Sequence, residues 1–294
     1  QSMANLASNN ARQIYNQISG LNIYQNDDAG IQLHIGGRGL DPNRTSNFNT
    51  RQNEYDISAD VLGYPESYYT PPSEAIKEIQ IVRGAASLQY GTQFGGLINF
   101  IMKEPSNKKI EFITRNTAGS NNLYTTFSSL SGRVKKFSYY TYYNYKKGDG
   151  FRDNSEFKSN NFYFHLGYEI NRRTKITGEI SYLNYLAQQA GGLSDRMFST
   201  APFQSNRSRN WFGLDWFLFN LKVNHKFSSA SNLSINFFGL DAERSSIGFR
   251  SNRVDQVDPF TERDLIKGEF NNHGVEVKFL NNYNFFNLKN VFVI

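Results

Sequence analysis

The feature of this chain that most constrains its fold is a regular alternation of apolar and polar residues, which begins near Ile110. Apolar side chains recur at every second position over residues 162–170, 176–182 and 217–223. Successive side chains of a β-strand point to opposite faces of the sheet. Each segment therefore predicts a strand with one apolar face and one mostly polar face.

The two faces of these predicted strands suit two different surroundings. The alternating stretches run for about ten residues, the length that crosses a bilayer at a tilt, whereas most strands of soluble proteins have five or six residues. We expect Phe164 and Phe219 to face lipid, and Glu169 and Lys222 to face a wet interior. A soluble β-sandwich, which buries one face of each strand in a core, is the alternative.

The connections between the predicted strands alternate in length. Short polar links fall near residues 132–136, 171–174, 228–232 and 284–288, and longer ones near 147–157, 188–211 and 245–267. A transmembrane barrel has this pattern, with tight turns at its periplasmic rim and long loops outside. Aromatic residues near the ends of the strands predict an interfacial girdle. They are Tyr139, Tyr140, Tyr142, Tyr143, Tyr145, Trp211 and Trp216.

Composition argues against several other classes of protein. The chain has no cysteine, so it can hold no disulfide and no thiolate metal site. Its net charge is +6, but the basic residues are scattered and form no stripe of the kind that binds nucleic acid. The four histidines lie far apart, and the common catalytic motifs are absent. We therefore expect no catalytic residue, no metal site, no cofactor and no nucleic-acid partner.

The region before the alternating strands has a different sequence pattern, without sustained alternation of apolar and polar residues. Two strand-like runs each end in an Arg-Gly turn, at Arg38 and at Arg83, where glycine allows the backbone to turn tightly. This region ends at a polar hinge near Pro105. The sequence thus predicts a compact α+β domain over residues 1–105 and an array of antiparallel strands over residues 106–294.

The segments IQLHIGGRGL (31–40) and SEAIKEIQIVRGAASLQYGTQFGGLINF (73–100) resemble the plug domain of TonB-dependent outer-membrane transporters. Two stretches, LGYPESYYTPP (62–72) and GAASLQYGTQFGG (84–96), resemble the ferric-citrate group of that family. The resemblance implies an N-terminal plug inside a membrane β-barrel of about 22 strands, of which this chain would hold about nine. It also implies a location in the bacterial outer membrane, in contact with its lipid and lipopolysaccharide.

The function implied by the resemblance is TonB-dependent import of a ferric chelate, either ferric citrate or a similar carboxylate siderophore. Such a protein is a transporter and not an enzyme, and it takes its energy from the TonB complex of the inner membrane. The TonB box and a signal peptide are expected outside this segment. The alternatives are import of an oligosaccharide, haem or cobalamin by the same architecture, or a passive porin-type barrel.

The resemblance also assigns roles to individual residues. Arg38 and Arg83 are expected to pair with glutamates of the barrel wall and lock the plug, the alternative being exposed turn arginines. Gln93 and the loop residues Arg207 and Arg209 are expected to bind the substrate, because arginine forks suit clustered carboxylates. Lipopolysaccharide phosphates or loop carboxylates are the alternative partners of these two arginines.

Overall fold

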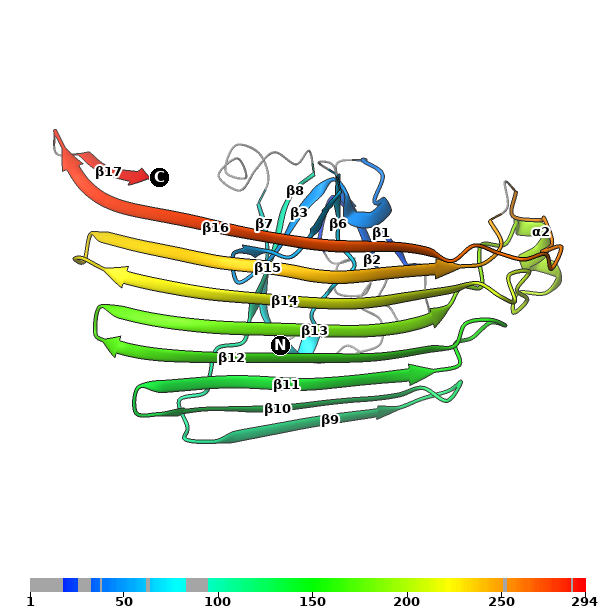
Figure 1. Cartoon of the computed structure of the whole chain (residues 1–294), viewed down its shortest axis with the longest axis horizontal. Helices are drawn as coiled ribbons and strands as arrows, with labels where there is room; N and C mark the ends of the chain where they lie inside the picture. The colour runs from blue at the N-terminus through cyan, green and yellow to red at the C-terminus, as the bar shows by residue number, and fades with distance from the viewer. Residues whose placement is uncertain are drawn as a thin grey trace.

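The computed structural model describes residues 18–25, 33–37, 39–61, 64–82, 95–250, 253–286 and 288–294. Nine strands form one antiparallel sheet in sequence order, which we call the wall (Figure 1). They are β9 (Glu111–Ala118), β10 (Tyr124–Val134), β11 (Phe137–Gly148), β12 (Phe157–Asn171), β13 (Thr174–Gln188), β14 (Trp211–Lys226), β15 (Ser231–Ile247), β16 (Ile266–Phe285) and β17 (Leu288–Val293). In the described residues β9 and β17 are the two edges of the wall, so it is an open part of a barrel, as predicted.

The central strands of the wall are longer than the sequence predicts. β12 and β13 have 15 residues each, and β14, β15 and β16 have 16, 17 and 20. About ten tilted residues suffice to cross the hydrocarbon layer. All five strands exceed this length, and toward the loop end their outer face includes polar side chains, such as Asn184 and Asp215. The loss of apolar alternation at these positions hides the true strand ends in the sequence.

The alternation of the two faces follows the prediction. Phe164 is 36% exposed on the outer face, and Phe219 lies on the same face, 5.5 Å from the ring of Phe237. Lys222 points the other way, since its Nζ lies 2.7 Å from a carboxylate oxygen of Glu54 in the N-terminal domain. The outer and inner faces are thus apolar and polar as the sequence indicates.

The predicted aromatic girdle is wrong for three residues. Tyr140, Tyr142 and Trp216 are 3%, 1% and 0% exposed, because they occupy inward positions of their strands and pack inside. Tyr143 and Trp211 occupy outward positions, together with Tyr139 and Tyr145. Residue type alone suggested the girdle, but the period of two decides which face each ring occupies.

The connections between wall strands alternate as predicted. Short turns join β10 to β11, β12 to β13, β14 to β15 and β16 to β17 at one end of the wall, and the long loops gather at the other end (Figure 1). The loop between β13 and β14 contains the short helix α2 (Asp195–Thr200), whose N-cap Ser194 accepts a hydrogen bond from the amide of Met197. No helix in the described part of the chain is both long and apolar enough to cross a membrane.

The N-terminal domain, which we call the plug, lies against one face of the wall (Figure 1). Its elements are β1 (Leu21–Gln25), β2 (Leu33–Gly37), η2 (Asn43–Thr45), β3 (Phe48–Gln52), β4 (Tyr55–Asp56), β5 (Ala59–Val61), β6 (Tyr64–Glu66), η3 (Ser73–Ala75), β7 (Ile76–Val82) and β8 (Gly96–Met102). A mixed four-stranded sheet in the order β4-β3-β8-β7 forms its centre, with β3 parallel to β8. The described part of the plug thus consists of strands and two 3-10 helices of three residues each.

An aromatic core joins the plug to the wall. Trp216 of β14 is fully buried, 5.9 Å from the ring of Tyr68 in the plug and 6.1 Å from that of Phe270 in β16. Burying an aromatic side chain removes about 150–250 Å² from water. At about 25 cal/mol per Å² this contributes roughly 4–6 kcal/mol relative to an exposed ring. The plug is therefore packed against the wall and not merely tethered to it.

Candidate functional site: the plug–wall interface and the loop cluster

The turn between β3 and β4 carries the plug's polar contacts with the wall. Its two central residues, Asn53 and Glu54, have φ angles of 46° and 77°. Two positive φ angles are typical of the tight hairpin turn whose twist matches the flanking strands. The left-handed conformation is uncommon for glutamate, and such residues persist where their surroundings hold them. Here the contacts of the turn with three wall strands supply that constraint.

The first of these contacts joins Arg51 to Glu276 of β16. The guanidinium donates two hydrogen bonds to the carboxylate, with N–O distances of 3.0 and 2.5 Å, and the arginine side chain is only 4% exposed. It also donates to Asn49 Oδ1 at 2.8 Å and to the carbonyl of Glu54. A fork-to-fork pair of this kind fixes orientation as well as distance. Arg51 therefore bonds both the turn beside it and a wall strand 225 residues away in the sequence.

The second contact joins Asn53 to Glu179 of β13. The amide Nδ2 lies 2.9 and 3.1 Å from the two carboxylate oxygens, and His165 Nδ1 of β12 lies 2.9 Å from the same carboxylate. Beside it Gln52 donates to Ser181 Oγ at 3.0 Å. A buried carboxylate needs such partners, since burial without them is costly. The plug turn thus completes the hydrogen bonding of a wall glutamate.

The third contact is the ion pair between Glu54 and Lys222 of β14, with an N–O distance of 2.7 Å. Burial opposes ionisation of Glu54, but the positive charges of Lys222, Lys278 and Arg51 together outweigh it and hold the pKa of this carboxyl below its usual value. Glu54 is therefore ionised near neutral pH, and its pair with Lys222 adds a screened attraction at the tip of the turn.

Other plug residues reach further strands of the wall. Arg244 Nε of β15 lies 3.7 Å from Glu66, and Arg115 of β9 lies 3.7 Å from Glu74. Together with the turn, these contacts attach the plug to both halves of the open wall. The polar interface is therefore distributed across strands and does not depend on a single pair.

A second cluster forms where the long loops meet, and it contains both loop arginines that the sequence singles out. Arg207 is 7% exposed and donates to the carbonyl oxygens of Asn206 and Gln256 at 3.1 and 2.8 Å. Its guanidinium lies over the ring of Phe249, 5.2 Å from the centroid. Burial lowers the pKa of this guanidinium from its usual value, but arginine remains a cation in proteins.

Arg209 makes a bidentate pair with Asp258 in the β15–β16 loop. Its Nε and one terminal nitrogen lie 2.9 and 2.7 Å from the two carboxylate oxygens, and Arg263 reaches the same carboxylate at 3.1 Å. The hydrogen bonds from Arg209 hold the pKa of Asp258 well below its usual range. Two arginines thus bind one carboxylate here, and Arg207 and Arg263 both lie over the ring of Phe249, so three guanidinium groups gather in this cluster.

Of the five predicted site residues, the structure describes two, Arg207 and Arg209. Arg38, Arg83 and Gln93 lie outside the described residues, so their predicted roles remain predictions. Arg207 and Arg209 come together in one cluster, where Arg209 binds a loop carboxylate, one of the alternatives considered for it. Whether they also bind a substrate remains a prediction.

Sequence reasoning missed the β3–β4 turn. Its signal is faint: a charged residue, Arg51, inside a short strand, followed by Asn53 at a turn. The wall partners could not be paired with it, because strand alternation shows which face a residue occupies but not what lies opposite. In the described part of the chain no group of three or more histidine or acidic side chains is arranged to hold a metal ion.

Comparison with known proteins agrees with this architecture. The sequence profile of the TonB-dependent Receptor Plug Domain family matches residues 1–97. No curated protein sequence matches the chain significantly. The match covers about a third of the chain and is a likeness of residues 1–97 to the plug domain of TonB-dependent receptors.

Solved structures match the plug and the wall together. The unliganded ferric citrate transporter FecA matches with a TM-score of 0.78 and 20% identity, over 94% of this chain and 42% of that one. The ferric preacinetobactin receptor BauA from Acinetobacter baumannii matches with a TM-score of 0.74 and 14% identity, over 95% and 43%.

The receptor FpvA from Pseudomonas aeruginosa, bound to pyoverdine, matches with a TM-score of 0.74 and 15% identity, over 100% of this chain and 44% of that one. The chain thus spans somewhat more than two fifths of the length of these receptors. It has the fold of their plug and part of their barrel.

Proposed function

We propose that this chain is part of an outer-membrane transporter that imports a ferric chelate in a TonB-dependent manner. The observation that carries the proposal is the folded plug seated against the inner face of the wall. A passive porin needs an open lumen and has no use for such a plug. A plug held by polar groups as well as by aromatic packing can exchange many of its contacts for water when it is pulled.

The TonB complex of the inner membrane is the partner that would supply this pull. The plug–wall contacts set the resistance that it must overcome. Arg38 and Arg83 would add to that resistance by pairing with wall glutamates, as the family resemblance implies. The proposed domain boundary near residue 105 would then separate the plug, which moves, from the wall, which stays fixed in the membrane.

For the cargo we propose ferric citrate or a similar carboxylate siderophore. The loop cluster supports this, because it gathers the guanidinium groups of Arg207, Arg209 and Arg263, and only Asp258 is seen to bind any of them through a carboxylate in the described residues. Gln93 is a further candidate contact from the plug. Haem is disfavoured, since the loops 189–210 and 248–265 contain no histidine.

An oligosaccharide is the second candidate cargo. Phe198 and Phe203, in and just after α2, are 60% and 63% exposed. Exposed rings on a long loop offer stacking surfaces to sugar rings. The same transporter architecture would serve this cargo, so the two candidates differ only in what the loops bind.

The test is ferric-citrate binding to the purified full-length protein and to two variants. The Arg207→Ala/Arg209→Ala variant removes two positive charges, whereas Asp258→Asn breaks the same cluster and keeps them. If the arginines bind the chelate, the double variant should bind on the order of a hundredfold more weakly, and Asp258→Asn should bind at least as tightly as the unmodified protein.

The outcomes separate the candidates. If both variants bound ferric citrate equally weakly, the arginines would stabilise the loops and would not themselves bind the chelate. Arg253→Ala serves as the control, because among the described residues the ion pair of this exposed arginine is a local one, with Asp255 at 3.4 Å. If the unmodified protein bound an oligosaccharide and no ferric carboxylate, the cargo would be the second candidate.

A further inference from the structure

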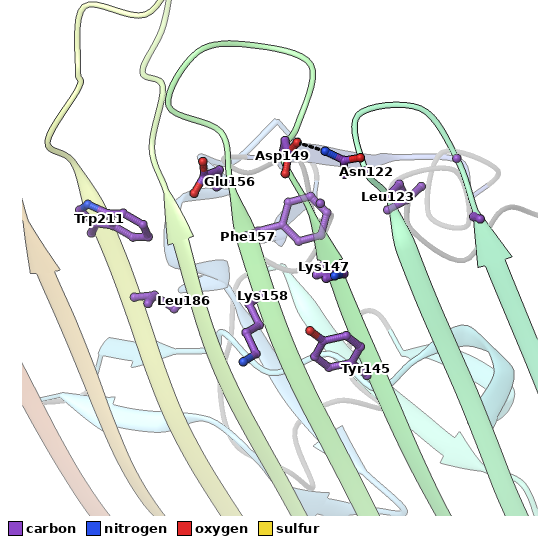
Figure 2. A pocket seen from close by; sticks show the side chains of 13 residues that line it. Asn122, Leu123, Tyr145, Lys147, Asp149, Glu156, Phe157, Lys158, Leu186 and Trp211 are labelled. Atoms are coloured by element: carbon purple, nitrogen blue, oxygen red, sulfur yellow. Dashed lines mark hydrogen bonds between the residues drawn. The ribbon is translucent and has the colours of Figure 1, made fainter.

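A hollow lies on the outer face of the wall, near the end that carries the long loops. It has a volume of about 690 Å³ and is lined by residues of β9, β11, β12, β13 and β14 and of the β9–β10 turn, and at its loop end it reaches the inward-facing Phe157 (Figure 2). Outward side chains form its floor and sides, among them Tyr145, Lys147, Lys158, Leu186 and Trp211. Because these five side chains point away from the plug, the part of the hollow that they form lies apart from the cargo site proposed above.

Two lysines dominate the charge of this hollow. Lys147 and Lys158 are directly opposite each other on the antiparallel strands β11 and β12. Like charges at such positions repel, since their Cβ atoms are only about 5 Å apart. Neither ammonium group forms a salt bridge with any residue that the structure describes. An anion placed between them would turn this repulsion into attraction.

The lysines sit at the depth of a lipid headgroup. On the same outer face, four residues along the strands from them, lie Tyr143 and Phe162, and the face stays largely apolar from there to the short turns. Four residues correspond to about 13 Å along a strand, and less along the membrane normal because strands tilt. Tyrosine and tryptophan, here Tyr145 and Trp211, are typical of this interfacial layer.

Two carboxylates close the opposite, loop end of the hollow. Asp149 and Glu156 lie above the lysines in Figure 2, and Asp149 accepts a hydrogen bond from Asn122 at 2.5 Å. These groups repel an anion that arrives from the external solution. An anion that arrives from the membrane side meets the lysines first. The charge distribution therefore favours a headgroup over a free ion.

We propose that this hollow binds the phosphorylated headgroup of an outer-leaflet lipid. The phosphate oxygens lie between the ammonium groups of Lys147 and Lys158, which bind phosphate as point charges. Leu186 and Trp211 flank the headgroup, and an acyl chain runs along Tyr145 and Phe162 toward the apolar part of the face. The proposal rests on the outer-membrane location proposed above, but not on the identity of the cargo.

The experiment compares three forms of the full-length protein in nanodiscs: unmodified, Lys147→Gln/Lys158→Gln, and Lys109→Gln/Lys135→Gln. The last is a matched control, because it removes two exposed lysines at the short-turn end of the wall. Native mass spectrometry counts the copies of a phosphorylated glycolipid, or of its dephosphorylated form, that each protein retains. Inorganic phosphate is added as a competitor.

The expected result is at least a fivefold loss of phosphorylated lipid from Lys147→Gln/Lys158→Gln and none from the control. The unmodified protein should retain the dephosphorylated lipid as poorly as the variant retains the phosphorylated one. Equal retention by all three proteins would overturn the proposal, and so would displacement of the lipid by millimolar inorganic phosphate.

Ferric-citrate uptake is measured in the same variants. Uptake that fails in every form while lipid is retained would count against the proposed cargo and leave the lipid site standing. Normal uptake with equal lipid retention in all forms would count against the lipid site and leave the proposed cargo standing.

Discussion

Replacing Arg51 should loosen the plug far more than replacing an exposed wall arginine. Breaking a buried ion pair by removing one partner costs about 3–5 kcal/mol, because the other charge stays behind. Glu276 is 23% exposed and keeps Lys278 at 3.7 Å, which places Arg51→Ala at the lower end of this range. We therefore expect a local destabilisation of about 3 kcal/mol, or roughly a hundredfold in the opening equilibrium.

Hydrogen–deuterium exchange of the full-length protein in detergent measures this opening at the backbone amides of residues 48–56. Local opening free energies are read from such exchange when closing is faster than exchange. Arg51→Ala should speed exchange there about a hundredfold, and the double variant Arg51→Ala/Glu276→Gln should recover part of the loss because it leaves no carboxylate at position 276 without its arginine partner.

Arg133→Ala is the control for this experiment. Its pair with Glu169 spans 2.9 Å but is 39% and 46% exposed, and both partners belong to the wall. Exposed pairs contribute about 0–1 kcal/mol, so exchange at residues 48–56 should stay within about twofold of the unmodified protein. If Arg51→Ala changed exchange no more than this control does, the Arg51–Glu276 pair would not hold the plug.

Three further predictions concern the plug, the loops and the outer face. Gly95→Ala should destabilise the plug by about 1–3 kcal/mol in thermal unfolding, because its new Cβ would lie 2.6 Å from a backbone oxygen, whereas Gly178→Ala has open space and should be nearly neutral. The pKa of Asp258 is held low, so its stabilisation of the loops is complete above about pH 4 and is lost as the pH falls through the folded-state value. Trypsin should therefore cleave these loops faster in Asp258→Asn than in the unmodified protein at neutral pH. Equal cleavage rates would show that Asp258 does not stabilise the loops. Leu221→Arg, on the apolar outer face, should destabilise the membrane-inserted protein by about 2–4 kcal/mol, against about 0–1 kcal/mol for Thr126→Arg near the loop end, as measured by urea unfolding in lipid vesicles.

The sequence predicts the wall well because its signal is local. A period of two assigns each residue to a face without knowledge of any distant contact, and it placed Phe164, Phe219 and Lys222 correctly. The same rule, applied strictly, would have put Tyr142 and Trp216 inside. Their residue type favours the membrane interface, but their position in the strand decides which face they occupy.

The plug contacts and the loop cluster were beyond sequence reasoning for a different reason. Arg51 and Glu276 are far apart in the chain, and nothing local distinguishes an arginine that forms such a pair from one that faces water. Arg207 and Arg209 were recognised as a cluster of charge, but the sequence leaves open whether a guanidinium binds cargo, a carbonyl or a neighbouring carboxylate. Only the packing of the long loops shows their present partners.

We propose that this plug closes a transporter that must be energised to pass a ferric chelate. The most direct test is uptake of radiolabelled ferric citrate by cells that make the full-length protein, with the proton-motive force intact and collapsed. We predict saturable uptake in the first condition and none in the second, with chelate binding unchanged. Equal uptake in both conditions would show a passive pore and contradict the account.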